Sequence, residues 1–223
     1  MAASAANRMK VERFVEERIV RLQDQLLIQK RPVAKAQLAR LRRVAAMPPG
    51  ESPEVWELEF AQLPESLAGT GAAQATEGEW AVHLALALYA THQQSQNAGM
   101  FVRTNKETGE LHGLGDGVRR LAYANQTNGE GEQLSQGEMP RRFKALVTAE
   151  SIAELAHYAR QLVAQLRSAS IPLDYARLAG QLYDFQHPYL RSRVRLEWAR
   201  EFARRDPEAR DQVDVTQDDS NEA

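Results

Sequence analysis

Cysteine is absent from this chain of 223 residues. Its absence excludes disulfide bonds, thiolate metal sites and cysteine nucleophiles, and it agrees with a reducing cytoplasm, where we expect the protein to work. Long apolar runs are missing as well. The longest, WAVHLALALYA at residues 80–90, has about half of the length that a membrane span needs. We therefore expect a protein that makes no contact with a membrane.

Sequence motifs that carry catalysis are equally scarce. No two of the five histidines are four residues apart, and the chain contains neither the HExxH pattern of zinc peptidases nor the GxSxG pattern of hydrolases. No tight pair of carboxylates suggests two-metal nuclease chemistry. We therefore expect a protein that is not an enzyme and that binds neither a metal ion nor a cofactor.

Aromatic residues make up only 7% of the chain. The three tryptophans, Trp56, Trp80 and Trp198, stand at apolar positions of the expected helices, so we expect them in the core. The sequence therefore predicts no exposed aromatic platform on which nucleic-acid bases could stack. His83 lies within an apolar helix and is expected to be a hydrogen-bonded core residue. Four acidic residues are expected on helix surfaces: Glu51, Glu54, Glu57 and Glu59.

Residues typical of helices fill most of the chain, whereas the alternation of apolar and polar residues that marks strands is hard to find. Apolar residues recur every three or four positions, as they do in amphipathic helices. This spacing predicts helices at about residues 7–29, 33–46, 54–63, 80–94, 117–124, 141–147, 152–166, 172–182 and 191–205. The expected fold class is therefore all-α.

The polar stretch NQTNGEGEQLSQGEMP, at residues 125–140, contains no apolar pattern from which a core could be built. We expect two packed helical bundles, one on either side of it. The predicted parts are an N-terminal helical domain at 1–125, a polar linker at 126–140, a C-terminal helical bundle at 141–205 and an acidic tail at 206–223.

The net charge of −2 conceals an asymmetry along the chain. The tail at 206–223 contains seven acidic residues and one arginine, a net charge of −6. Because the whole chain carries −2, the other 205 residues carry +4. A basic body with an acidic tail often accompanies nucleic-acid binding, although a solvated acidic tail on an ordinary domain explains these charges equally well.

The stretch GLGDGVRRLA, at residues 113–122, spaces three glycines before Arg119 and Arg120. It lacks the lysine and the hydroxyl residue of a nucleotide-binding P-loop, and its spacing differs from that of the dinucleotide fingerprint. A helix that begins here would still present free backbone N–H groups and two arginines to a nucleic-acid phosphate. A glycine turn followed by two solvated arginines is the alternative.

The stretch KRPVAKAQLARLRR, at residues 30–43, contains six basic residues and no acidic one. On the expected helix, Lys35 and Arg42 lie together opposite the apolar arc, and Arg43 flanks them. A run of one charge gains no stability from ion pairs within the helix, so an anionic partner explains it better.

Two further basic clusters lie in the second half of the chain. In the stretch PRRFK, Arg141 and Arg142 begin an expected helix. In the last expected helix, Arg193 and Arg200 share a face on which Glu197 lies between them. Salt bridges on a solvated helix surface are a serious alternative for this last cluster.

Several stretches, taken in their order and spacing, resemble one known family. They are LARLRRVA, AVHLALALYATHQQS, GLGDGVRRLA, RRFKALVTAESIAELAHYARQLVAQLR, PLDYARLAGQLYDF and RVRLEWAREF. Together they are similar to the small subunit of the type I-E CRISPR Cascade complex, the CasB family. The resemblance extends over about residues 8–204, and it rests on the ordered set of stretches rather than on a single motif.

This resemblance implies a non-catalytic, all-helical protein of two bundled domains, present as two copies, head to tail, in a complex guided by crRNA. It implies contacts with the large subunit and the backbone subunits of Cascade, and with the target DNA when the R-loop opens. The matching positions expected to face nucleic acid are Arg42, Arg43, Arg119, Arg120, Arg141 and Arg142. The helical positions described above add Lys35, Arg193 and Arg200.

Two other functions remain open at this point. A free-standing DNA-binding regulator would need a helix-turn-helix, and no convincing short turn between two such helices is present. A helical protein–protein scaffold would use the same basic faces to meet acidic partner surfaces. The resemblance assigns no role to the polar linker or to the acidic tail.

Overall fold

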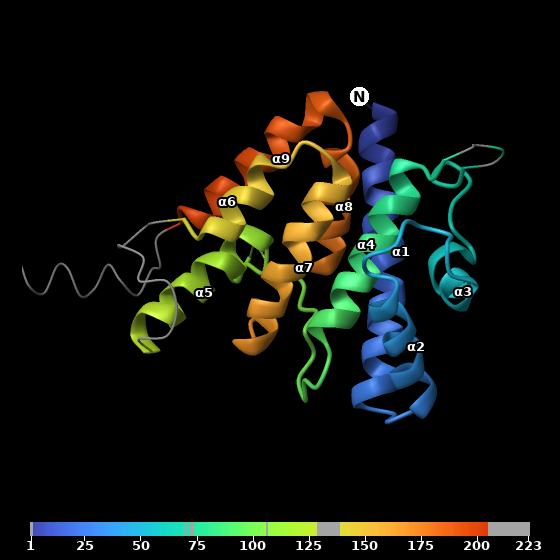
Figure 1. Ribbon diagram of the computed structural model, residues 1–223, viewed down its shortest axis with the longest axis horizontal. Helices are drawn as coiled ribbons and strands as arrows, with labels where there is room; N and C mark the ends of the chain where they lie inside the picture. The colour runs from blue at the N-terminus through green and yellow to red at the C-terminus, as the bar shows by residue number, and fades with distance from the viewer. Residues whose placement is uncertain (1, 70, 72–73, 106, 129–138, 205–223) are drawn as a thin grey trace, which may run out of the picture.

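The computed structural model of the chain describes residues 2–69, 71, 74–105, 107–128 and 139–204 (Figure 1). Within these residues all regular secondary structure is helical, apart from two isolated β-bridges. The elements are α1 (Ala2–Leu27), α2 (Pro32–Arg43), the 3₁₀ turn η1 (Pro53–Val55), α3 (Trp56–Phe60), α4 (Glu77–His92), α5 (Leu114–Asn128), α6 (Arg141–Thr148), α7 (Ile152–Ser168), α8 (Tyr175–Phe185) and α9 (Pro188–Phe202). The predicted all-α fold class is confirmed.

Capping and proline explain where three of the helices begin. Helix α4 begins three residues earlier than predicted because the side chains of Thr76 and Glu79 form a reciprocal capping box. Helix α8 begins at Tyr175, after Pro172, because the Asp174 carboxylate accepts a hydrogen bond from the backbone N–H of Arg177 at 3.0 Å. Helix α9 begins at Pro188, whose fixed φ suits the first helical position.

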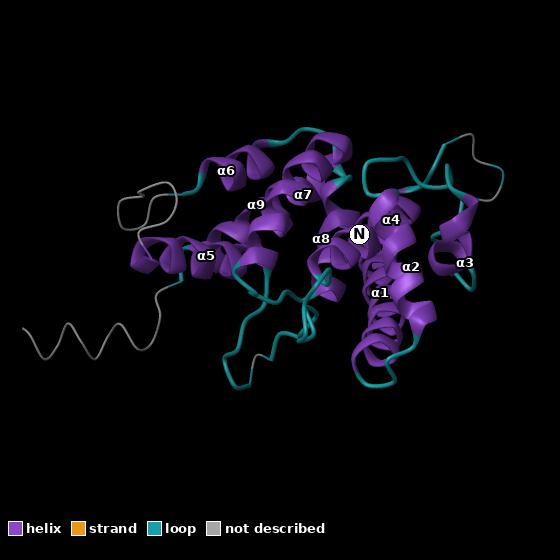
Figure 2. Ribbon diagram, turned by 60° about the horizontal axis from the view of Figure 1, so that its bottom comes forward, coloured by secondary structure: helices purple, strands orange, loops and turns teal. Residues whose placement is uncertain are grey.

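The centre of the molecule is formed by α4 and α8. Helix α4 is buried almost all round, and it packs against α1, α2, α7 and α8. Figure 2 shows α8 between α1 and α9, both of which it contacts. The buried apolar side chains of these helices form one cluster that extends from Val11 in α1 to Trp198 in α9. Most of the folding free energy therefore comes from a core that the two halves of the chain share.

Packing crosses the predicted boundary between the two domains. Helix α5, which precedes that boundary, packs against α9 and α7, whereas α8, which follows it, packs against α1 and α4. The division into 1–125 and 141–205 is compatible with the fold but stays a prediction. The acidic tail and most of the polar linker lie outside the described residues. In the described part of the chain, no helix is both long and apolar enough to span a bilayer.

Two expectations about individual side chains are wrong. Trp56 was expected in the core but is 47% exposed, because its short helix places the indole against the preceding turn, where the indole N–H donates to the Gly50 carbonyl at 2.9 Å. Glu59 was expected on the surface but is fully buried beside His83. The other tryptophans differ from each other: Trp198 is fully buried, as predicted, and Trp80 is half-buried.

The core position predicted for His83 is confirmed. Its ring is 2% exposed, and both ring nitrogens have a partner. The Nδ1 atom lies 2.8 Å from the Glu59 carboxylate, and the Nε2 atom lies 2.9 Å from the Met47 carbonyl oxygen. These two contacts tie the segment between α2 and α4 to the central helix.

Candidate nucleic-acid interface

The glycine-rich stretch at the start of α5 forms a helix–helix contact. A Cβ atom on Gly115 would lie 2.2 Å from the backbone carbonyl oxygen of Trp198 in α9, so only glycine allows this approach. The Gly115 N–H also donates to the buried carboxylate of Glu201 at 3.0 Å. Gly115 is therefore explained by the packing of α5 against α9, whereas a Cβ on Gly117 would lie 2.7 Å from the Leu173 side chain, just before α8.

A carboxylate already occupies the first turn of α5. Asp116 is 3% exposed, and it makes ion pairs with Arg119 at 2.8 Å and with Arg120 at 3.1 Å. Arg120 also donates to the Pro172 carbonyl at 3.1 Å. Arg120 thus helps to hold α5 in place, and the contact of both arginines with nucleic acid stays a prediction.

Helix α2 presents two different basic flanks. At about 100° per residue, Lys35 and Arg42 point in nearly the same direction, and Arg43 points about 100° away from Arg42. Arg42 is half-buried and Lys35 is exposed, and neither makes an ion pair with a carboxylate of the described residues. Arg43 instead pairs with Glu54. This ion pair and its hydrogen bond hold the pKa of the Glu54 carboxyl below its usual range.

Two arginines of α7, which sequence reasoning missed, lie near the ends of α2 and α4, and one of them, Arg167, acts on Arg42. Arg160 and Arg167 lie seven residues apart and so share a face of the helix. Arg160 donates to the Ala45 carbonyl at 2.8 Å, just beyond the end of α2. Arg167 donates to the Gln94 side chain at 2.9 Å, just beyond the end of α4. Their spacing of seven residues was the available signal.

Within the described residues, no carboxylate compensates the positive charge at this junction. Burial, followed by the charge of Arg167, lowers the pKa of Arg42. Burial also lowers the pKa of His92 in α4 to about 4, and the charge of Arg167 contributes to that shift. Among the described residues, no carboxylate forms an ion pair with Arg42 or Arg167. We call Lys35, Arg42 and Arg167 the α2–α7 cationic patch.

The remaining predicted residues lie on α6 and α9. Arg141 and Arg142 are exposed at the start of α6, where the Arg142 side chain donates to Gln161 at 3.1 Å. Arg200 is exposed near the end of α9. Arg193 is also exposed, but it pairs with Asp184, and its guanidinium lies 3.8 Å from Glu197. For Arg193 the geometry agrees with the salt-bridge alternative.

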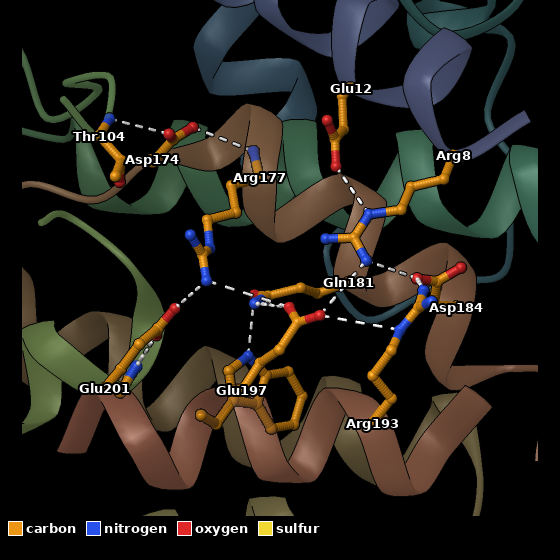
Figure 3. Close-up of polar contacts among 12 residues, drawn as sticks. Arg8, Glu12, Thr104, Asp174, Arg177, Gln181, Asp184, Arg193, Glu197 and Glu201 are labelled. Carbon is orange, nitrogen blue, oxygen red and sulfur yellow. Dashed lines mark hydrogen bonds and ion pairs between the residues drawn. The ribbon is translucent and has the colours of Figure 1, made fainter. Parts of the chain in front are cut away.

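Figure 3 shows that Arg193 belongs to a network at the junction of α1, α8 and α9. Arg8 of α1 reaches Asp184 at 2.7 Å and Glu12 at 2.9 Å, and Arg177 of α8 reaches Glu201 of α9 at 2.6 Å. A cavity of about 490 Å³ beside this network is lined by Arg8, Arg103, Arg177, Glu12, Asp174 and Glu197, with Thr104. Its arginines are matched by acidic residues, so the cavity offers no net attraction to an anion.

No cluster of histidine, aspartate and glutamate with the geometry of a metal site is present in the described ranges. The arrangement instead supplies cationic side chains on helix surfaces, which can bind phosphate groups without reading base sequence.

Comparisons with known proteins agree on one family. Residues 37–202 match the family described as CRISPR-associated protein Cse2. The chain is 32% identical to CasB from Thermobifida fusca, whose crystal structure it matches with a TM-score of 0.66 over 87% of this chain and 98% of that one. It is 26% identical to a Cse2-family protein from Thermus thermophilus, with a TM-score of 0.55 over 86% of this chain and 96% of that one.

None of the proteins with a curated description matches the chain. The family match nevertheless extends over most of the sequence, and both solved structures are matched along nearly their whole length. With the all-helical fold, these similarities place the chain in the Cse2 (CasB) family of CRISPR-associated proteins.

Proposed function

We propose that this chain is a non-catalytic, nucleic-acid-binding subunit of a Cascade complex, and that it stabilises the pairing of crRNA with target DNA. Membership of the Cse2 family makes it a Cascade-type subunit in CRISPR defence. Its partners would be the crRNA and target DNA, the large subunit, the backbone subunits and a second copy of itself, arranged head to tail. It would act through phosphate contacts that are blind to base sequence.

The observation that carries this proposal is the positive charge of the α2–α7 cationic patch, with whose arginines no carboxylate in the described part of the chain forms an ion pair. Partly exposed arginines that meet no carboxylate gain nothing from internal pairing, and Arg42 loses hydration through its partial burial. A phosphate group in contact with Arg42 and Arg167 would relieve the repulsion between them. Arg141, Arg142 and Arg200 supply further exposed positive charge on α6 and α9.

The energetics of R-loop opening make weak phosphate contacts sufficient. The heteroduplex of guide and target strand is about as stable as the DNA duplex that it replaces, so a few backbone contacts tip the balance. The net charge of +4 on residues 1–205 is modest. We therefore expect weak binding by the isolated chain and stronger binding within the complex, where the effective concentration is high.

We expect Arg42→Ala to weaken target-DNA retention by the assembled complex about fivefold to tenfold, which corresponds to the usual net contribution of one hydrogen bond. Arg43→Ala is the matched control. Because Arg43 is adjacent in sequence but paired with Glu54, its removal should change retention less than about twofold. Dissociation constants for a labelled target duplex at about 0.15 M salt measure both effects. Equal effects of the two substitutions would show that the patch has been assigned to the wrong flank of α2.

The same titration separates the other functions. A free-standing regulator would prefer one duplex sequence, whereas the proposed subunit binds all sequences alike outside the guide-matched region. A pure scaffold would assemble normally and show no loss of DNA retention in any of the arginine variants.

A further inference from the structure

Trp56 and its surroundings form a second exposed feature that phosphate binding leaves unexplained. Trp56 is 47% exposed and Met47 is 43% exposed, and both belong to the segment between α2 and the end of α3. Figure 1 shows α3 at one edge of the molecule, with α5 and α6 at the opposite edge. We call residues 47–60 the Trp56 corner.

The Trp56 corner is held rigidly on the core. The His83 ring binds both Glu59 and the Met47 carbonyl, so it anchors the corner at two points from within α4. Arg18 of α1, itself 8% exposed, donates to the Leu58 carbonyl at 3.3 Å and to the Ala61 carbonyl. A partner that binds to the corner therefore meets a preorganised surface, and binding costs little conformational entropy there.

The orientation of the indole is also set in advance. Its N–H donates to the Gly50 carbonyl at 2.9 Å, and Gly50 adopts a φ of +85°, which favours glycine. This bond satisfies the one polar atom of the ring and leaves apolar ring surface exposed to solvent. Large aromatic residues held in this way are typical anchors of protein–protein interfaces.

The charges around the indole decide which partner it suits. Residues 47–60 contain four glutamates and no lysine or arginine, and three of the glutamates, Glu51, Glu54 and Glu57, are exposed. Arg43 pairs with Glu54, on which the charge of Arg40 also acts, and the charge of Glu57 acts on the buried Arg18. Every exposed charged side chain within residues 47–60 is nevertheless acidic, and Glu51 has no ion pair among the described residues. The surface of the corner therefore favours lysine and arginine side chains over a polyanion.

We infer that the Trp56 corner is the anchor through which this subunit docks onto a protein surface of the complex that carries basic side chains around an apolar pocket. The inference rests on the proposed function, because that partner is another Cascade subunit. It assigns the two sides of α2 different roles: the flank of Arg42 meets nucleic acid, and the flank of Arg43 leads to the protein contact.

The test measures affinity for the remainder of the complex, purified without this subunit and without DNA. We expect Trp56→Ala to weaken that affinity at least about tenfold, as hot-spot tryptophans do. Tyr189→Ala is the matched control, because Tyr189 is 64% exposed on α9 and should change the affinity less than about threefold. Circular dichroism and thermal melting verify that both variants fold. A Trp56→Ala variant that assembles as tightly as the parent overturns the inference.

Charge reversal at the rim tests the choice of partner independently. Glu51→Lys should weaken assembly about fivefold if the partner is basic, and the effect should shrink at high salt. If Glu51→Lys or Trp56→Ala instead changes only the binding of single-stranded DNA, the corner contacts nucleic acid and the inference is wrong. If Arg42→Ala leaves DNA retention unchanged, the result contradicts the proposed function and not this inference, because that measurement does not involve the Trp56 corner.

Discussion

Gly115→Ala is expected to destabilise the protein by about 3 kcal/mol, at the upper end of the usual cost of overpacking. The added methyl group would lie 2.2 Å from the Trp198 carbonyl oxygen, and that oxygen belongs to the backbone of a packed helix. To relieve the clash, α5 and α9 must move apart, which would also lengthen the hydrogen bond from the Gly115 N–H to Glu201. The midpoint of urea unfolding, compared with that of the parent, measures this cost.

Gly180→Ala is the matched control for this substitution. Its Cβ would lie 2.1 Å from Oε1 and 2.7 Å from Cγ of Glu12, a partly exposed side chain that can turn away at the cost of its ion pair with Arg8, which keeps Asp184 as a partner. Alanine also has the higher helix propensity, by about 1 kcal/mol. We expect a loss below about 1 kcal/mol for this variant. If Gly115→Ala is no more harmful than Gly180→Ala, Gly115 does not serve helix packing, and an anion site at that turn becomes the better explanation of this glycine.

The free energy of unfolding is expected to fall by about 3 kcal/mol as the pH is lowered from 6.5 to 4, because His92 is buried in its neutral form. Burial, together with the charge of Arg167, lowers its pKa from 6.5 to about 4 in the folded state. The ring is fully buried, and its Nδ1 atom lies 2.9 Å from the Tyr175 hydroxyl. In this pH window the unfolded chain binds a proton that the folded protein excludes. The stabilisation is therefore complete above pH 6.5 and is lost as the pH falls.

The measurement compares the unfolding free energies of the parent and of His92→Gln across this window. Other acidic groups titrate in both proteins and cancel in the difference. The variant should lack the decline of about 3 kcal/mol even if it is less stable at neutral pH. Parallel curves for the two proteins would show that His92 does not carry this pH dependence.

The fold was predictable from the sequence because helical periodicity is a local signal. The apolar positions of α1, for example, recur every three or four residues and lie in the core. The predicted helix positions are confirmed to within a few residues. The caps of α4 and α8 account for the shifts at the starts of these two helices, because a cap depends on side chains outside the periodic pattern.

The candidate site was less predictable because charge compensation is largely a tertiary property. The partner of Arg43 is eleven residues away, and Asp184, which pairs with Arg193, stands on another helix. Arg167 reaches the patch only because α2 and α7 both pack on α4. Asp116 was the exception, since its spacing of three and four residues from Arg119 and Arg120 is visible in the sequence.

The burial of Trp56 and Glu59 was mispredicted for a related reason. Helix α3 has only five residues, too few for its pattern of apolar positions to decide which side faces the core. The contacts that set its orientation come from Arg18 of α1 and His83 of α4, which lie 40 and 24 residues away in sequence from their partners Leu58 and Glu59.

The salt dependence of target-DNA binding tests the central claim most directly. Each phosphate contact contributes about 0.7 to 0.9 to the slope of log K against log salt concentration. If Arg42 and Arg167 each neutralise a phosphate, binding by the double variant Arg42→Ala/Arg167→Ala should depend less steeply on salt. The magnitude of the slope should fall by about 1.5 in the assembled complex. An unchanged slope, in a variant complex that assembles normally, would show that the α2–α7 cationic patch does not contact nucleic acid.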